Sequence, residues 1–213
     1  MRILVVAPDQ PGINTRPEIR QVQRRHHMSV LDGTVTAEDI YAACRDTAFD
    51  VHHYASHSGP DGVALSDGAL FTAEDIAQVA RLKETPCLFF NSCDSGKLAS
   101  YAVCHGVRFA VHTNVEIEDN GAWKPALAFY ESLQNGHGKD FVGAYVVADS
   151  GDGDYGLSVS PTYLQELQHM AATAILPRRD AVVLTRWQMI LFAAGIVAAS
   201  GAWTMLINAL SGR

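Results

Sequence analysis

The chain has 213 residues, of which 48% are hydrophobic, and a formal net charge of −7 at pH 7. This length and apolar content suit a globular domain that buries a substantial core. Lysine and arginine are scattered along an acidic chain without a basic stripe, which argues against nucleic-acid binding as the main activity. The four cysteines (Cys44, Cys87, Cys93 and Cys104) form no C-x-x-C pair and no signal peptide opens the chain, so we expect reduced thiols in the cytosol.

Apolar strands and amphipathic helices alternate along the first 150 residues. A tight hairpin is predicted over 62–71, because Asp67-Gly68 lies between apolar residues. Apolar strands separated by helices predict an α/β fold with a mainly parallel sheet and helices on both faces. The strands are predicted over 2–8, 49–56, 86–93 and 107–114, and the helices over 16–27, 36–48, 72–82, 97–106, 124–136 and 140–150.

A histidine and a cysteine stand at the carboxyl ends of two successive predicted strands. His57 follows the strand 49–56, and Cys93 ends the strand 86–93. If these strands are neighbours in a parallel sheet, the two side chains rise from one edge within about 5–10 Å of each other. An imidazole can take the proton of a thiol, which predicts His57 as base and Cys93 as nucleophile. The backbone N–H groups of Cys93 and of Ser58 or Gly59 are candidate donors to an oxyanion.

Other interpretations of these residues stay open on spacing alone. A cysteine at a strand end is often simply packed, and a histidine beside a strand is often a satisfied polar residue. A zinc site built from His52, His53 and His57 lacks a convincing fourth ligand. The acidic, glycine-rich stretch 149–156 lacks the downstream acidic ligand of an EF-hand and is interpreted as a solvated loop. We therefore expect no metal and no cofactor.

The last part of the chain has a different character. Residues 187–210 run for 24 positions without a charge, and a helix of that length rises about 36 Å, enough to cross a hydrocarbon core of about 30 Å. Arginines cluster in 178–186, which by the positive-inside bias keeps the N-terminal domain cytoplasmic. We expect a domain over 1–177, a basic linker over 178–186 and a single transmembrane helix over 187–210. The alternative is a hydrophobic helix that docks in a core or an oligomer interface.

Several stretches resemble a known family of cysteine peptidases. "HYASHSG" (53–59) resembles the histidine strand H-Y-S-G-H-G of metacaspases and other caspase-like peptidases. "FFNSCDSG" (89–96) resembles the L-N-A-C-E-S-G run of CHAT-domain peptidases, which belong to clan CD with separases and caspases. The resemblance covers about residues 2–148 and includes three further stretches. "RILVVAPDQPGINTRPEIRQVQ" is similar to the opening strand and E-x-R helix of CHAT-type domains, and "LSDGALFTAEDIAQV" is similar to their hairpin and following helix. "AFYESLQNGHGKDFVGAYVVA" is similar to their late helix pair.

The resemblance implies a three-layer caspase-like α/β fold and peptide-bond cleavage through a thioester on Cys93, with His57 as general base. There are departures from the pattern. Ser58 stands directly after the histidine, where the family usually has glycine. Metacaspases often carry an aspartate shortly before the cysteine, which binds a basic P1 residue, and Asn91 and Ser92 occupy those places here. Asp94 resembles the acidic residue that follows the cysteine in CHAT domains. Asn91 and Asp94 are therefore candidates for substrate binding.

Three functions follow as hypotheses. The leading one is a membrane-anchored cysteine endopeptidase that cleaves a protein or peptide substrate, as relatives do in bacterial defence systems, with a lipid bilayer as partner through 187–210. An activating partner subunit or a homo-oligomer would then switch it on. The second is a catalytically inactive caspase-like binding module at the membrane, favoured by Ser58. The third is a structural membrane subunit in which His57 and Cys93 are incidental.

Overall fold

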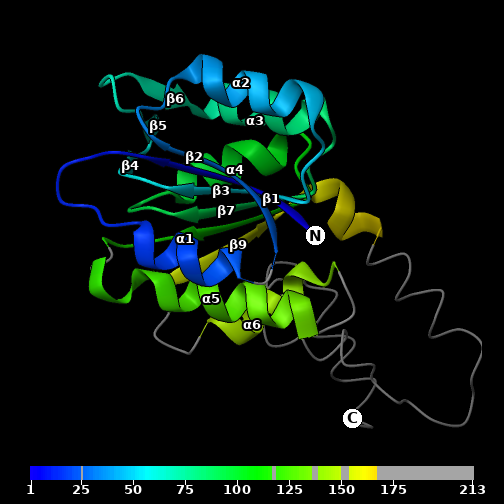
Figure 1. The fold of residues 1–213 in the computed structure, drawn as a ribbon. Helices are drawn as coiled ribbons and strands as arrows, with labels where there is room; N and C mark the ends of the chain where they lie inside the picture. The colour runs from blue at the N-terminus through cyan, green and yellow to red at the C-terminus, as the bar shows by residue number, and fades with distance from the viewer. Residues whose placement is uncertain (25, 117–118, 136–138, 150–153, 167–213) are drawn as a thin grey trace, which may run out of the picture. The chain divides into compact units, whose positions relative to one another are not determined.

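The computed structural model describes residues 1–166 except 25, 117–118, 136–138 and 150–153, and Met1–Gln165 form one compact unit (Figure 1). The predicted domain boundary at 177, the linker 178–186 and the membrane span 187–210 lie outside the described residues. Within the described ranges, no helix is both long enough and apolar enough to cross a membrane.

A six-stranded sheet forms the centre of this unit. The strand order is β2-β1-β3-β7-β8-β9, and every neighbouring pair is parallel except β8 and β9. The prediction of a mainly parallel sheet is confirmed, and β3 and β7 are direct neighbours. The strands are β1 (Arg2–Pro8), β2 (His27–Gly33), β3 (Val51–Ala55), β7 (Cys87–Asn91), β8 (Phe109–Thr113) and β9 (Tyr155–Val159).

Helices cover both faces of the sheet, as Figure 1 shows. One face carries α2 (Ala37–Asp46), α3 (Ala73–Leu82) and α4 (Gly96–Cys104). The other carries α1 (Arg16–Gln23), α5 (Asp119–Asn135) and α6 (Phe141–Ala148). Together with the sheet they make three layers, the arrangement that apolar parallel strands require.

Two of the helices begin with reciprocal caps that their sequences encode. Thr36 and Thr72 each precede Ala-Glu-Asp, and in both cases the threonine hydroxyl accepts the N–H of the aspartate three residues on. The carboxylates of Asp39 and Asp75 accept the threonine N–H in return. Such a capping residue typically stabilises a helix by about 1 kcal/mol.

The central strands alternate their side chains between the two faces. The rings of Tyr54 and Phe90 stack with their centroids 5.4 Å apart on the face covered by α2, α3 and α4. The rings of His53 and Phe89 stack with their centroids 5.1 Å apart, and His53 also lies against Tyr130 of α5. The core is therefore filled from both sides by rings on β3 and β7, which fixes the register of the two strands that lead to His57 and Cys93.

A second, three-stranded antiparallel sheet follows His57. It consists of β4 (Ser58–Gly59), β5 (Gly62–Ala64) and β6 (Leu70–Thr72), with β5 in the middle. The predicted hairpin is confirmed between β5 and β6, and Gly68 takes the positive φ of 81° that its turn requires. A Cβ at Gly62 would come within 2.7 Å of the Phe71 carbonyl oxygen, so only glycine lets these strands pair.

Two strands of the six-stranded sheet lie where none is predicted. The helix predicted over 16–27 ends at Gln23, and β2 follows it as an edge strand that includes the polar residues His27, Ser29 and Asp32. The interpretation of 149–156 as a loop is wrong at its end, because β9 begins at Tyr155. Gly156 weakens the strand signal there, yet a Cβ at this position would meet the His112 ring at 2.5 Å.

Candidate active site

His57 and Cys93 occupy equivalent positions beyond two paired strands. Ala55 of β3 and Asn91 of β7 are register partners, and His57 and Cys93 each follow two residues later. Because β3 and β7 are parallel, both residues leave the sheet at its carboxyl edge. His57 is exposed and Cys93 is half-buried. The expectation that neighbouring strands bring them to a shared edge is confirmed.

The two residues line the same pocket. Its volume is about 60 Å³, and the loop after β1 and the start of α1 form its other walls. Glu18 and Asn91 lie in this lining together with Trp123 of α5. His57 and Cys93 thus line one cavity, which is the first geometric requirement of a nucleophile and its base.

The imidazole of His57 is oriented by the loop after β1. Its Nε2 atom lies 3.1 Å from the carbonyl oxygen of Pro11, and its backbone N–H donates to Oε1 of Gln10 at 2.8 Å. A carbonyl oxygen can only accept, so Nε2 must carry the hydrogen in this contact. In the neutral ring Nδ1 is then the unprotonated nitrogen, and it is the atom that can take a proton from a thiol.

The turn that carries Cys93 is held by hydroxyl groups. The carbonyl oxygen of Ser92 accepts hydrogen bonds from Ser95 Oγ at 3.0 Å and from Thr113 Oγ1. Asp94 adopts a left-handed backbone conformation with φ of 46°, which reverses the chain between β7 and α4. The hydroxyl of Ser58 donates to the carbonyl oxygen of Cys93 at 2.5 Å. Cys93 therefore sits in a fixed turn just before the first turn of α4.

A buried polar network lies beneath the pocket. The Nδ2 atom of Asn91 is 2.8 Å from both carboxylate oxygens of Glu18, and Nε2 of His53 is 3.0 Å from one of them. Nδ1 of His53 is 2.9 Å from the Tyr130 hydroxyl. On the other side the Tyr155 hydroxyl donates to Oδ1 of Asn91 at 2.6 Å, and burial raises the pKa of Tyr155 so that it stays protonated. The network joins β3, β7, β9, α1 and α5 below Cys93.

Comparison with known proteins decides the family. The family model of the CHAT domain matches residues 7–141, which is more than half of the chain and includes both His57 and Cys93. The chain belongs to the CHAT domain family. No curated protein matches the chain significantly.

The fold is similar to that of a solved cysteine proteinase. It is similar to the Arg-specific cysteine proteinase gingipain R, with a TM-score of 0.50 and 12% identity over 72% of this chain and 43% of that one. It is also similar to the complex of pro- and mature gingipain domains from Porphyromonas gingivalis, with a TM-score of 0.53 and 10% identity over 76% and 47% of the two chains. The chain therefore spans less than half the length of these structures, and the likeness shows the fold alone.

The ladder of the small sheet distinguishes the two candidate oxyanion donors in this CHAT domain. The carbonyl oxygen of His57 accepts the N–H of Ala64 at 2.9 Å and therefore points toward β5, whereas the His57 N–H donates to Gln10. A peptide bond is planar and trans, so the N–H of Ser58 points in the opposite direction to the His57 carbonyl. The Ser58 N–H therefore points away from β5, although Ser58 is the register partner of Val63. The N–H of Gly59 points toward β5, which favours Ser58 over Gly59 as donor.

The two substrate-binding candidates lie in different surroundings. Asn91 lines the pocket, but its amide is engaged by Glu18 and Tyr155. Asp94 is exposed, and the described lining of the pocket does not include it. Contact of either residue with a substrate stays a prediction.

The histidines of β3 do not converge with His57. Nε2 of His52 faces Cys44 of α2 at 3.8 Å and Thr85 at 3.1 Å, whereas His53 faces Glu18 and Tyr130 on the other side of the sheet. Alternation along the strand separates them, so a zinc site from these three histidines is not formed. Among the residues that the structure describes, no group of three or more potential metal-binding side chains gathers.

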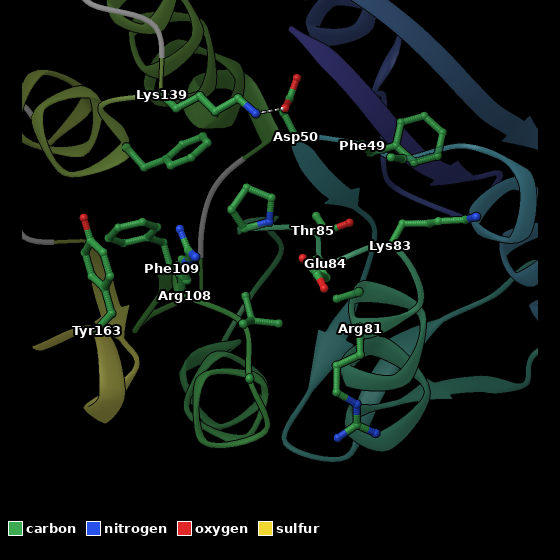
Figure 2. A pocket seen from close by; sticks show the side chains of 16 residues that line it. Phe49, Asp50, Arg81, Lys83, Glu84, Thr85, Arg108, Phe109, Lys139 and Tyr163 are labelled. Atoms are coloured by element: carbon green, nitrogen blue, oxygen red, sulfur yellow. Dashed lines mark ion pairs between the residues drawn. The ribbon is translucent and has the colours of Figure 1, made fainter. Parts of the chain in front are cut away.

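A larger cavity lies at the opposite edge of the sheet (Figure 2). Its volume is about 530 Å³, and it is lined by residues just before β3, β7 and β8, namely Asp50, Pro86 and Arg108, and by others. Lys139 and Asp50 form an ion pair of 2.6 Å at its rim. This end of the sheet is the amino end, several residues from His57 and Cys93, so cavity size and candidate chemistry do not coincide in this CHAT domain.

Sequence reasoning missed several residues that shape the site. Gln10 and Pro11 follow β1, the strand next to β3, so the rule that led to His57 could also have found them. Glu18 belongs to the E-x-R stretch that the resemblance singled out, but its place in the pocket depends on how α1 packs. Tyr155 carries no signal in the sequence, because the acidic, glycine-rich stretch 149–156 predicts a loop.

Proposed function

We propose that the chain is a cysteine endopeptidase that cleaves a protein or peptide through Cys93 and His57. One observation carries the proposal: the two side chains follow register partners of adjacent parallel strands and line one pocket. Membership of the CHAT family and the similarity of the fold to a solved cysteine proteinase support it. The tie between His57 Nε2 and the Pro11 carbonyl leaves the other ring nitrogen for proton transfer.

The residues present suffice for acyl transfer. Nδ1 of His57 takes the proton of the Cys93 thiol while sulfur forms a bond to the scissile carbonyl carbon. The negative charge on the carbonyl oxygen is stabilised by the N–H groups of Cys93 and Ser58. The imidazolium then gives its proton to the amine as the C–N bond breaks, which leaves a thioester. Water, deprotonated by His57, hydrolyses the thioester and regenerates the thiol.

A second candidate is an inactive caspase-like binding module. The small volume of the pocket, about 60 Å³, favours it, because a substrate side chain needs more room than this cavity provides. An active enzyme must therefore widen the pocket when a substrate, a partner subunit or a second copy binds.

The membrane location is a further proposal and rests on the sequence of 187–210 alone. A chain anchored in this way would keep the CHAT domain on the cytoplasmic face, where it could act as an effector of bacterial defence. Deletion of 187–213 is expected to release a domain that is soluble without detergent. Full-length protein that stays in the soluble fraction of cells, with the deletion variant no more soluble, would overturn the anchor.

The peptidase proposal is tested by cleavage of a diverse peptide library, read by mass spectrometry. We expect the wild type to cut a defined subset of sequences and Cys93→Ala to cut none. Cys104→Ala is the matched control, because Cys104 is an exposed cysteine at the far end of α4, and we expect it to retain wild-type cleavage. Absence of cleavage by all three proteins, with or without candidate partners, favours the inactive module.

A further inference from the structure

We infer that the Ser58 hydroxyl is a positioning group that fixes Cys93 relative to His57. The inference rests on the proposed peptidase function and deepens it. Ser58 follows the candidate base directly, where the resembling families usually have glycine. From the sequence this departure favours an impaired enzyme. In the structure the side chain has a definite role, because its Oγ donates to the carbonyl oxygen of Cys93 at 2.5 Å.

This hydrogen bond acts on the peptide unit that follows Cys93. A peptide bond is planar and trans, so the carbonyl of Cys93 and the N–H of Asp94 point in opposite directions. The Asp94 N–H donates to the carbonyl oxygen of Val115 at 3.4 Å, on the side of the loop after β8. Ser58 therefore holds the carbonyl oxygen of this peptide unit, and Val115 holds its N–H. If the Ser58 hydroxyl is removed, the long hydrogen bond from Asp94 N–H to the Val115 carbonyl is the one described hydrogen bond left on this peptide unit.

The peptide unit that precedes Cys93 is held from the other direction. The Ser92 carbonyl accepts from Ser95 and Thr113, so the Cys93 N–H in the same plane points away from those two residues. With the Ser58 bond, both planes that flank Cys93 are fixed. This sets the direction of the Cα–Cβ bond of Cys93 and of its N–H, the two features that acyl transfer uses.

Ser58 also connects the two candidate catalytic residues to each other. His57 is held at its N–H by Gln10 and at its ring by Pro11, and Ser58 is the next residue along the chain. The side chain of Ser58 reaches the cysteine turn while its N–H points away from β5, opposite to the His57 carbonyl. A glycine here would keep the N–H but lose the link between the two loops. Misplacement of reacting groups by about 1 Å can cost about 100-fold in rate.

The test compares Ser58→Ala and Ser58→Gly with Ser58→Thr, which restores a hydroxyl. In the two variants without a hydroxyl we expect kcat for a cleaved peptide, and the rate of Cys93 labelling by an electrophilic peptide, to fall about tenfold while KM stays within about twofold. Ser58→Thr is expected to recover most of the rate. The control is Ser66→Ala, because the half-buried Ser66 also donates to a backbone carbonyl, that of Gly33 at 2.7 Å, far from Cys93.

Two results would overturn the inference. One is a loss of rate in Ser58→Ala no larger than in Ser66→Ala, and the other is a Thr variant as slow as the Ala variant. Hydrogen exchange provides a readout that does not need activity: the Asp94 amide is expected to exchange about tenfold faster in Ser58→Ala than in wild type. If the wild type neither cleaves a peptide nor is labelled at Cys93, the proposed function fails. The exchange rate of the Asp94 amide then decides alone whether Ser58 holds the turn, and an equal rate in wild type and Ser58→Ala would overturn that role.

Discussion

Two combinations of cysteine and histidine can be compared within the described residues: Cys44 with His52, which are in contact inside the core, and Cys93 with His57, the proposed catalytic pair at the pocket. Sγ of Cys44 lies 3.8 Å from Nε2 of His52 inside the α2 face of the sheet, and each residue is only 1% exposed. Burial raises the pKa of the Cys44 thiol to about 12 and lowers the pKa of His52 to about 3. Proton transfer between them would create two buried charges, which the apolar surroundings oppose.

Cys93 and His57 occupy the contrasting environment. They follow the strand ends, line a pocket, and have polar groups and solvent around them. Backbone and hydroxyl groups orient them, whereas Cys44 and His52 are surrounded mainly by the core. The comparison teaches that a short sulfur–nitrogen distance does not identify a catalytic pair. Access for a substrate and stabilisation of charge do.

Thiol reactivity should separate the two cysteines by the largest factor. An ordinary cysteine has a pKa near 8.5 to 9, and burial raises that of Cys44 to about 12, so its thiolate is about a thousandfold scarcer at neutral pH. Treatment of native protein with iodoacetamide, followed by peptide mapping, is expected to modify Cys93 and to leave Cys44 intact until the protein is unfolded in urea. Modification of Cys44 in the native protein as fast as of Cys93 would remove the contrast.

The two histidines should differ nearly as much. His57→Ala is expected to lower kcat/KM for a cleaved peptide by about 100- to 10,000-fold, the usual contribution of a general base. His52→Gln is the matched variant of the buried pair, and its activity per folded molecule should stay within about threefold of wild type. Comparable losses in both variants, measured at matched folded fractions, would contradict the assignment of the base.

Acid should destabilise the protein through the buried pair. The pKa of His52 is lowered to about 3 by burial, against an ordinary value near 6.5. Between these values the unfolded chain binds a proton that the folded chain does not, so stability falls as pH falls from about 6.5 toward 3, by up to about 1.4 kcal/mol per pH unit. His112, whose pKa burial also lowers, adds to the slope.

Urea denaturation at several pH values measures this slope. The slope of the unfolding free energy against pH should become shallower in His52→Gln by up to about 1.4 kcal/mol per pH unit, the contribution of one proton. Equal slopes in wild type and His52→Gln would show that His52 does not remain neutral in the folded protein.

The polar support beneath Cys93 should give the smallest effect. Tyr155→Phe removes the donor to Oδ1 of Asn91 and leaves a buried acceptor without its partner, at a cost of about 1–3 kcal/mol. Thermal or urea denaturation measures the loss, and Tyr101→Phe on the exposed face of α4 is the control with little expected change. A Tyr155→Phe protein as stable as the control would mean that the network does not support the site.

Much of the fold followed from the sequence, because its strongest signals are local. Buried strands such as 2–8 and 86–93 are continuous apolar runs, and the Thr-Ala-Glu-Asp stretches encode caps that can be recognised without tertiary context. The edge strands β2 and β9 did not follow. About half of the residues of β2 are polar, and β9 contains Gly156, which is required by a close contact with His112 that only the folded chain reveals.

The candidate site was predictable to the level of an edge of the sheet. Parallel strands fixed that His57 and Cys93 share that edge, and the resemblance to CHAT peptidases gave them roles. The orientation of His57 by Pro11 and the bond from Ser58 to Cys93 depend on how loops far apart in the sequence pack together. No pattern within either loop specifies them. Ser58 in particular could be interpreted from the sequence only as a departure.

Covalent labelling with a mixture of peptidyl electrophiles tests the central claim most directly. The account predicts a single adduct on Cys93 in native wild-type protein, located by peptide mapping, and labelling at least about 100-fold slower in His57→Ala. An adduct on Cys44 or Cys104 instead, or equal labelling rates in wild type and His57→Ala, would contradict the pairing of Cys93 with His57.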